Sequence, residues 1–177
     1  MLTSDTLERV RGWFAGRLPQ EWQDGHLEVT VDREEVVVVL PLPDPELPEG
    51  ATEVERKEAR AGRAKAFREE TRERRVEVAR EAEHRYQRKV SWGVVVGAGD
   101  DAHRELFTHI AAPVMTRLRQ PERLVLDTLV DAGVARSRAD ALAWCVRLVG
   151  RHEGDWLAEL RTAMDSVADV RSKGPAA

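Results

Sequence analysis

The sequence of 177 residues predicts an α+β fold: a small layered domain over residues 1–112, followed by a mainly helical region. Three observations predict it. Apolar residues open the chain at helical spacing, apolar runs typical of strands follow, and a long segment rich in Arg, Glu and Ala separates those strands from a further one. A helix, a hairpin, a long helix and a third strand are therefore expected to form one small α+β layer.

The chain opens with a predicted amphipathic helix. Five apolar residues within residues 7–18 recur at helical spacing. Ser4 or Thr3 is the expected N-cap, and Pro19 stands just past the expected end of the helix.

A β-hairpin and a linker are predicted next. Apolar and polar residues alternate over residues 27–31, residues 32–34 are expected to form the turn, and the apolar run 36–40 returns. The proline-rich residues 41–50 are expected to be a linker, because proline cannot continue a sheet.

One long helix is predicted from Thr52 to about Arg88, a stretch with no proline and one glycine. Glu and Arg recur three or four residues apart along it, so its charged faces are expected to lie in water. Residues 89–97 follow as a third strand. The apolar side of the helix is thin and is expected to lie across the hairpin: Ala64, Phe67, Val78, Ala82 and Tyr86.

Residues 94–107, VVVGAGDDAHRELF, raise the question of nucleotide binding. Two glycines and an alanine in this stretch have the spacing of the dinucleotide-binding fingerprint. Asp100 and Asp101 would repel a phosphate at that turn. An ordinary turn from a strand into a short helix within residues 103–112, N-capped by the aspartates, is therefore predicted.

Charge is segregated along the chain more than the net charge of −4 indicates. Residues 1–55 hold four Arg and thirteen Asp or Glu, a net charge of −9. Residues 56–89 hold thirteen Lys or Arg and seven Glu, a net charge of +6. A polyanion could therefore bind locally to a chain that is acidic as a whole.

Composition argues against several classes of protein. The single cysteine, Cys145, rules out a disulfide framework within the chain, favours a reducing compartment and is expected to be a buried structural thiol. No apolar run approaches the ~20 residues that span a bilayer, and no signal sequence opens the chain, so a cytoplasmic protein without a membrane partner is expected. The five histidines lack metal-ligand spacing and no catalytic motif stands out, so no enzyme, metal or cofactor is predicted.

Residues 113–149, PVMTRLRQPERLVLDTLVDAGVARSRADALAWCVRLV, carry a more specific pattern. A predicted short strand and two helices contain, in order, the motifs Arg117-Leu118, Leu126-Asp127, Ala132-Gly133 and Ser137-Arg138-Ala139-Asp140-Ala141-Leu142. In type and spacing these motifs resemble the ribbon-helix-helix (Arc/MetJ/CopG-like) family of DNA-binding proteins, the fold of many bacterial repressors and antitoxins. Gly133 is the expected left-handed residue after the first helix, and Ser137 with Asp140 is the expected capping box of the second.

The resemblance implies an obligate homodimer, in which the strands of two copies pair antiparallel and enter the major groove of DNA as a ribbon. A lone strand on two helices has too little core to be stable by itself, which agrees with a dimer. Alternation along the strand turns Val114, Thr116 and Leu118 inward. The residues left to contact bases, or to bind a phosphate at the start of the second helix, are Met115, Arg117, Arg119, Ser137 and Arg138.

The second helix and the residues after it have further predicted roles. The second helix is expected to bury Leu142, Cys145, Val146 and Val149 on one side. Residues 150–177 are expected to form an amphipathic helix that covers the other side, at Ala141, Trp144 and Leu148, and then a frayed tail.

These features favour a homodimeric transcriptional regulator that binds double-stranded DNA, with a ribbon-helix-helix module at 113–149, a covering helix at 150–177, and a domain at 1–112 that could bind an effector or a partner protein. Several alternatives stay open. The module could dimerise or mediate interactions without DNA, or its strand could join the sheet of its own chain. The Arg-rich helix at 56–89 could bind RNA, and the regulator could be an antitoxin.

Overall fold

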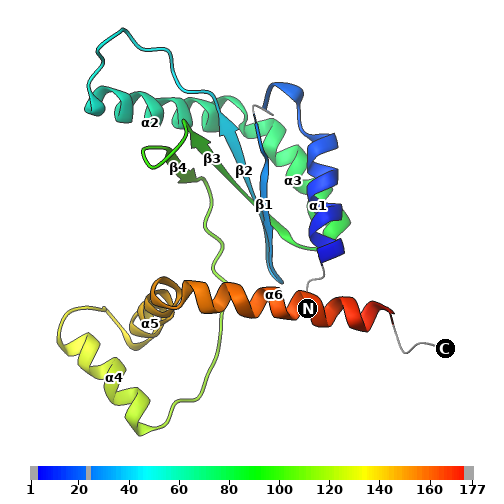
Figure 1. Cartoon of the computed structure of the whole chain (residues 1–177). Coiled ribbons are helices and arrows are strands. Elements are labelled where there is room, and N and C mark those ends of the chain that lie inside the picture. The colour runs from blue at the N-terminus through cyan, green and yellow to red at the C-terminus, as the bar shows by residue number, and fades with distance from the viewer. Residues whose placement is uncertain (1–3, 23–24, 174–177) are drawn as a thin grey trace. The chain divides into compact units, whose positions relative to one another are not determined.

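The computed structural model describes residues 4–22 and 25–173 and divides into two compact units, Met1–Ala112 (unit 1) and Pro113–Ala177 (unit 2) (Figure 1). The prediction of a mixed α+β protein is confirmed, because unit 1 combines helices with a four-stranded sheet and the described part of unit 2 is helical. The alternative N-cap Thr3 and the last four residues of the expected frayed tail lie outside the described residues.

Unit 1 is built on a sheet with the strand order β1-β2-β3-β4. The outer pairs β1/β2 and β3/β4 are antiparallel, and the central pair β2/β3 is parallel. Parallel neighbours need a crossover connection, which α2 and α3 supply. The elements of unit 1 are α1 (Ser4–Arg17), the 3-10 helix η1 (Gln20–Trp22), β1 (Glu28–Val31), β2 (Glu35–Leu42), α2 (Glu53–Glu70), α3 (Arg72–Tyr86), β3 (Lys89–Val96) and β4 (His103–Leu106).

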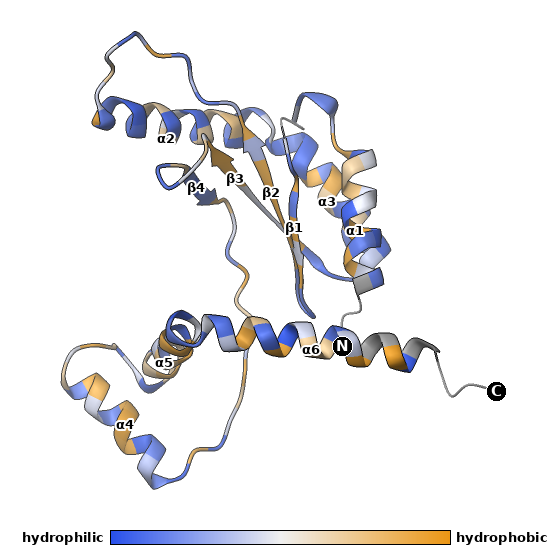
Figure 2. Ribbon diagram, viewed as in Figure 1, coloured by the Kyte–Doolittle hydropathy of each residue, from blue (hydrophilic) through white to orange (hydrophobic). Residues whose placement is uncertain are grey.

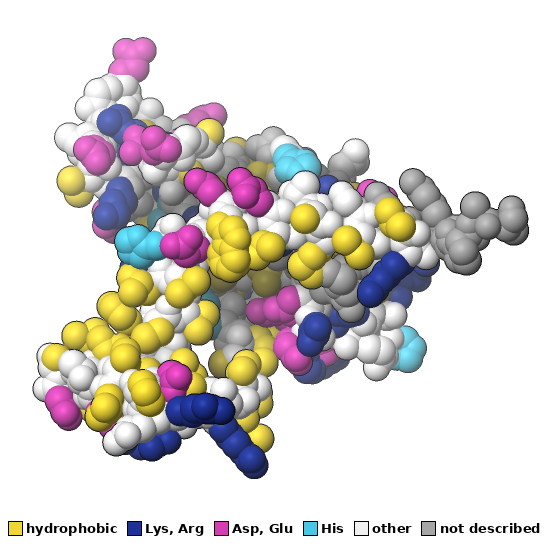
Figure 3. Space-filling model, turned by 60° about the horizontal axis from the view of Figure 1, so that its bottom comes forward, with side chains coloured by type: hydrophobic (Ala, Val, Ile, Leu, Met, Phe, Trp, Pro, Cys, Tyr) yellow, Lys and Arg dark blue, Asp and Glu magenta, His cyan; other side chains and the backbone are white. Residues whose placement is uncertain are grey.

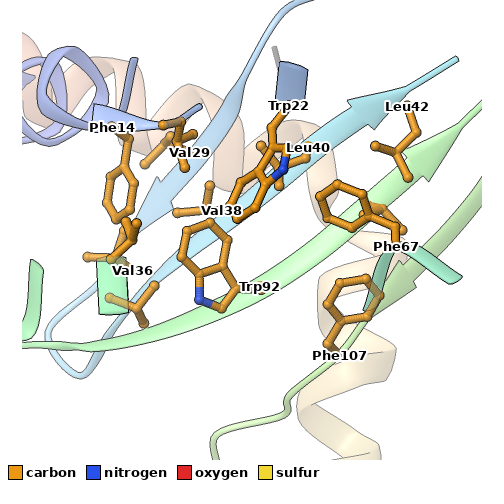
Figure 4. Close-up of a cluster of buried hydrophobic side chains, with 14 of the residues drawn as sticks. Phe14, Trp22, Val29, Val36, Val38, Leu40, Leu42, Phe67, Trp92 and Phe107 are labelled. Atoms are coloured by element: carbon orange, nitrogen blue, oxygen red, sulfur yellow. The ribbon is translucent and has the colours of Figure 1, made fainter. Parts of the chain in front are cut away.

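The main core of unit 1 lies between one face of this sheet and its helices. Even-numbered side chains of β2 and β3 point to that face, and they form a single cluster with apolar residues of α1, α2 and α3. At its centre Trp92 meets Phe14 and Trp22 edge to face, with ring centroids 5.9 and 6.5 Å apart (Figure 4). β3 and much of β2 accordingly carry the hydrophobic colour in Figure 2.

On the opposite face of the sheet, side chains of the strands themselves contact and cover one another. Arg104 on β4 donates hydrogen bonds of 2.8 and 2.9 Å to the carboxylate of Glu28 on β1, so this ion pair joins the two edge strands. Leu106 lies over Gly93, where an added Cβ would be only 2.6 Å from Leu106 Cδ2. Val39, which points to the same face as Glu28, is buried there.

The single long helix that the sequence predicts is in fact two helices, α2 and α3, with a break at Thr71. The Thr71 hydroxyl donates to the carbonyl of Phe67 at 2.5 Å. Arg75 donates to the Thr71 hydroxyl at 3.0 Å and to the carbonyl of Arg68 at 2.7 Å. Side-chain hydrogen bonds that compete with the backbone ladder are a known cause of helix kinks, and these two side chains account for the break.

The predicted helix within residues 103–112 is wrong, because residues 103–106 form strand β4. Val96 pairs with His103 across the loop of residues 97–102, and the N–H of Phe107 donates to the carbonyl of Trp92 at 2.7 Å. Pairing with β3 and burial of the Phe107 ring outweigh the local helix signal. The fingerprint-like glycines therefore belong to a β-hairpin, and the helix that a bound dinucleotide would need is not there.

The predicted start of the linker is also wrong, because Pro41 belongs to β2. Pro41 pairs with Val95 of β3, whereas the pairing of β2 with β1 ends at Val39. The missing N–H of Pro41 therefore costs no hydrogen bond to β1, which is where a sheet tolerates proline.

Unit 2 contains α4 (Gln120–Asp131), α5 (Arg138–His152) and α6 (Gly154–Lys173). The predicted left-handed residue after α4 is confirmed: Gly133 has φ +73°, and Val134 N–H donates to the carbonyl of Leu129 at 3.0 Å in a Schellman motif. The predicted N-cap of α5 is confirmed too, since the Ser137 hydroxyl accepts from Asp140 N–H at 3.2 Å. The capping box is only half formed, because the Asp140 carboxylate accepts from Arg136 N–H instead of Ser137.

Several predictions of burial in unit 2 are wrong for the single chain. Residues 113–119 form no strand, Cys145 is half-buried, and Val146 and Val149 are exposed. Leu157 of α6 is half-buried, but the other large apolar side chains of that helix among the described residues are exposed. Of the residues that α6 was expected to cover, Trp144 and Leu148 are half-buried, and Ala141 is buried against α4 instead. The core cluster of unit 2, among the described residues, has only three buried members: Leu126, Ala135 and Ala141.

Candidate functional site

Three of the five predicted DNA-contact residues lie in one exposed segment that precedes α4. Met115, Arg117 and Arg119 are all exposed, and Met115 is 96% exposed. Arg117 makes no hydrogen bond or ion pair within the described part of the chain, so its guanidinium is available to a ligand. Arg119 is the residue before α4, and its carbonyl accepts the N–H of Arg123 at 3.1 Å.

The other two predicted contacts lie at the start of α5 and already have partners. The Ser137 hydroxyl caps the helix, as described above. Arg138 donates two hydrogen bonds, 2.6 and 2.8 Å, to the carboxylate of Asp127 on α4. The bond to Arg138 holds the pKa of Asp127 below its ordinary value, and the same bond raises the pKa of Arg138. This bidentate pair ties α4 to α5 and neutralises the charge that the sequence assigned to a phosphate.

Unit 2 also exposes an unusual amount of apolar surface. Val114 is 86% exposed. Figure 3 shows hydrophobic side chains gathered over the part of unit 2 that holds α4 and α5 and along α6. Exposed apolar surfaces of this extent are typical of protein–protein, membrane or ligand interaction sites. The large apolar residues concerned are Val114, Met115, Leu124, Val125, Val134, Val146, Val149, Trp156, Leu160, Met164, Val167 and Val170.

Unit 1 holds a second candidate site that sequence patterns did not reveal, a cavity of about 490 Å³ between the α2–α3 break and β3. Its floor is apolar, and the rings of Trp92 and Phe107, both labelled in Figure 4, form part of it. The side chains of Arg68, Arg72, Arg75 and Arg80 supply its charge.

Arg75 is the most unusual of these four arginines, because it is 7% exposed and has no carboxylate partner among the described residues. Besides its two hydrogen bonds at the helix break, its guanidinium lies over the ring of Phe107, 4.8 Å from the centroid. Burial, with Arg68 and Arg72 nearby, lowers the pKa of Arg75 to about 10. Buried charges in proteins are usually paired, so this one marks the cavity as a candidate anion site.

The other polar groups of the cavity leave it electropositive. Arg72 and Arg80 are exposed and make no hydrogen bond or ion pair within the described residues. Of the two glutamates that line the cavity, Glu83 is bound to Lys89 at 3.0 Å. The indole Nε1 of Trp92 is buried and donates no hydrogen bond within the same residues.

One sequence signal could have revealed this cavity. The thin apolar side of the predicted long helix has a gap between Phe67 and Val78, and spacings of four, four and three residues place Thr71 and Arg75 in it. A charged residue at a core position of an amphipathic helix is a rare choice that calls for a partner.

Some of the segregated charges of unit 1 pair with one another. Arg74 of the basic stretch pairs with Glu21 at 2.7 Å, and Arg60 pairs with Asp44 at 2.5 Å. The guanidinium of Arg60 also lies against Gly97, where it would clash with any Cβ. The glycine that resembles part of a phosphate-binding turn therefore makes room for an arginine.

None of the helices within residues 4–22 and 25–173 is long and apolar enough to cross a membrane. Across the same residues, no three side chains of His, Cys, Asp or Glu lie close enough together to hold a metal ion.

Together these features define a two-unit α+β protein, with an arginine-lined cavity in unit 1 and an incompletely buried helical unit 2. Residues 8–102 match the family described as Rv1265-like protein, N-terminal domain, and residues 119–171 match the Mb1296 C-terminal domain. The first match spans more than half of the chain, so the chain belongs to the Rv1265-like family.

The chain is 62% identical over 164 residues to the proteins Mb1296 of Mycobacterium bovis and Rv1265 of Mycobacterium tuberculosis. The aligned region covers 92% of this chain and 69% of each relative. No solved structure matches the chain at a significant level. Neither family description names a ribbon-helix-helix fold, so that fold stays a prediction for residues 113–149.

Proposed function

We propose that this protein is a homodimeric DNA-binding regulator, in which residues 113–119 of two copies pair as a β-ribbon that enters the major groove. The observation that carries the proposal is the state of this segment in the single chain: apart from half-buried Leu118 it is exposed, it pairs with no strand, and it stands directly before two helices. A ribbon strand gains its hydrogen bonds only from a second copy, so a single chain leaves it in this state.

The apolar surface of unit 2 supports a second copy as the partner. Three buried residues are too small a core for a unit of this length, and units with so little core usually need oligomerisation. Pairing of the ribbons would bury Val114 and bring the α4–α5 surfaces of two copies together. The Schellman motif at Gly133 and the N-cap at Ser137 lie where the family resemblance places the end of the first helix and the start of the second.

Within this proposal the DNA contacts fall mainly on the ribbon. Arg117 has a free guanidinium and points outward by alternation, and it is the best candidate for bidentate contact with a guanine. Met115 and Arg119 flank it. Arg138, bound to Asp127, positions α5 against α4, and the N-terminus of α5 with Ser137 faces the phosphate.

The test is a selection of bound duplexes from random DNA with the full-length protein, followed by affinity measurements on the enriched sequence over a range of salt concentrations. An enriched palindrome is expected, because a symmetric dimer reads two half-sites. Arg117→Ala should weaken binding to the selected site by about tenfold or more, in line with the loss of one bidentate base contact. Arg151→Ala removes the same charge from an exposed site near the end of α5 and is the matched control.

Two results would count against a DNA regulator. Failure to enrich any sequence would favour the alternative in which the module only dimerises or binds another protein. Equal weakening by Arg117→Ala and Arg151→Ala would show that only diffuse charge attracts DNA. Binding of RNA, with no preference for duplex DNA, would favour the Arg-rich stretch 56–89, although ion pairs already occupy Arg60 and Arg74 there.

A further inference from the structure

We propose that the cavity between the α2–α3 break and β3 in unit 1 binds a small organic phosphate that carries a flat apolar group. This site is distinct from the proposed DNA-binding ribbon, and every residue that lines it belongs to unit 1.

The charge of the cavity calls for an anion with more than one negative charge. Four arginines and two glutamates line it; Glu83 is bound to Lys89, and Arg68 is paired with Glu105 at 3.7 Å, which leaves three arginines without a carboxylate partner among the described residues. Arg72 and Arg80 stand free at the cavity, while Arg75 lies buried with no carboxylate partner among the described residues. Guanidinium groups bind phosphate oxygens through paired, charge-assisted hydrogen bonds, so a phosphate fits this cluster.

The floor of the cavity calls for an apolar group on the same ligand. Trp92, Phe107 and Val90 present rings and methyl groups there, and Val76 on α3 is half-exposed beside them. Inorganic phosphate alone would leave this apolar surface exposed to solvent, whereas a flat ring would cover it and could stack on the guanidinium groups.

The dimensions favour a small molecule over a macromolecule. A volume of about 490 Å³ lies within the range of ligand cavities, which runs from roughly 300 to 1,000 Å³. Arg75 is 7% exposed, so a flat macromolecular surface would not engage its guanidinium, which lacks a carboxylate partner among the described residues.

The test follows the five tryptophan indole N–H signals of the full-length protein by NMR during titration with ATP and, separately, with 1-naphthyl phosphate. Trp92→Phe assigns the signal of Trp92. Saturable movement of the Trp92 signal is expected with either probe, while the signal of Trp144 in unit 2 stays in place. Tripolyphosphate carries the phosphate charge without a ring, and adenosine carries the ring without a phosphate. Each should bind at least about tenfold more weakly than ATP.

Variants locate the site. Arg72→Ala and Arg80→Ala change exposed side chains and should leave the fold intact while weakening ATP binding by about tenfold each, as the loss of a charge-assisted hydrogen bond predicts. Arg75→Met keeps the bulk of the buried side chain and should weaken binding at least as much. Arg85→Ala, on α3 but outside this cavity, is the matched control and should leave affinity unchanged.

The comparison between probes separates two sources of ligand. Tighter binding of ATP than of 1-naphthyl phosphate points to nucleotides, and equal binding points to aryl phosphates in general. The proposal is overturned if neither probe moves the Trp92 signal at about 5 mM, a concentration at which even weak sites fill. It is also overturned if tripolyphosphate equals ATP and Arg85→Ala weakens binding as much as Arg72→Ala, because both results indicate diffuse charge attraction.

Discussion

The proposed ribbon makes opposite predictions for two neighbouring residues that are equally exposed in the single chain. Val114 is 86% exposed and Met115 is 96% exposed, so the single chain gives no reason to treat them differently. In a paired ribbon their side chains point to opposite faces, with Val114 against the helices of the dimer and Met115 toward DNA. Val114→Ala should therefore weaken the dimer, and Met115→Ala should not.

The size of the effect follows from the exposed surface of Val114. The substitution removes two methyl groups, and each contributes about 0.8 kcal/mol when it is buried. Scaled by the 86% of the side chain that dimerisation would cover, and counted for both copies, the loss is about 2.8 kcal/mol. That loss corresponds to a rise of roughly 100-fold in the dimer dissociation constant.

Sedimentation equilibrium of the full chain over a wide range of concentrations measures this constant. Met115→Ala should stay within about twofold of the parent, as expected for a surface change away from the interface. A parent protein that is monomeric at micromolar concentration would refute the ribbon. So would equal effects of the two substitutions, since alternation would then be absent.

Three other predictions concern stability. Gly93→Ala places a Cβ 2.6 Å from Leu106 Cδ2 and 2.8 Å from the carbonyl oxygen of Glu105. Urea unfolding should therefore show a free energy of unfolding that is lower by about 1–3 kcal/mol. Gly12→Ala, on α1 where a Cβ meets no neighbour, is the control and should not lower it. Thr71→Val leaves the buried guanidinium of Arg75 with one acceptor fewer and should cost about 1–3 kcal/mol in the same assay; Thr71→Ser, which keeps the hydroxyl, should cost much less. Because Arg138 lowers the pKa of Asp127, this pair stabilises the folded state above the ordinary carboxylate pKa of about 4, and the contribution is lost as pH falls through the lower folded pKa. Asp127→Asn should flatten that acid dependence, and an unchanged pH profile would contradict the role of the pair.

Local patterns predicted the elements whose signals are local. The first helix, the hairpin and the third strand follow from apolar spacing, and the caps at Gly133 and Ser137 follow from residue types with a known backbone preference. The apolar stripe of the long helix was also placed correctly at Ala64, Phe67, Val78 and Ala82, which are all buried.

The elements that sequence patterns missed depend on distant partners. Strand β4 has only four residues, and its aspartate-rich approach resembles a helix start; pairing with β3 decides its conformation. The break at Thr71 depends on how one buried arginine satisfies its donors. The cavity at Arg75 combines residues up to 40 positions apart, from Arg68 to Thr108, so no short motif could identify it.

The two units differ in what they need in order to fold, and this difference can be measured in the intact chain. Unit 1 buries eighteen residues in one cluster, while the cluster of unit 2 has three buried members among the described residues. If a second copy completes unit 2, the folding of unit 2 is coupled to association and the folding of unit 1 is not. Heating should then give two transitions, one at a fixed midpoint and one whose midpoint rises with protein concentration. Circular dichroism at several protein concentrations tests the coupling, and Val114→Ala should lower only the second midpoint. Two midpoints that are both independent of concentration would mean that unit 2 is completed by something other than a copy of itself.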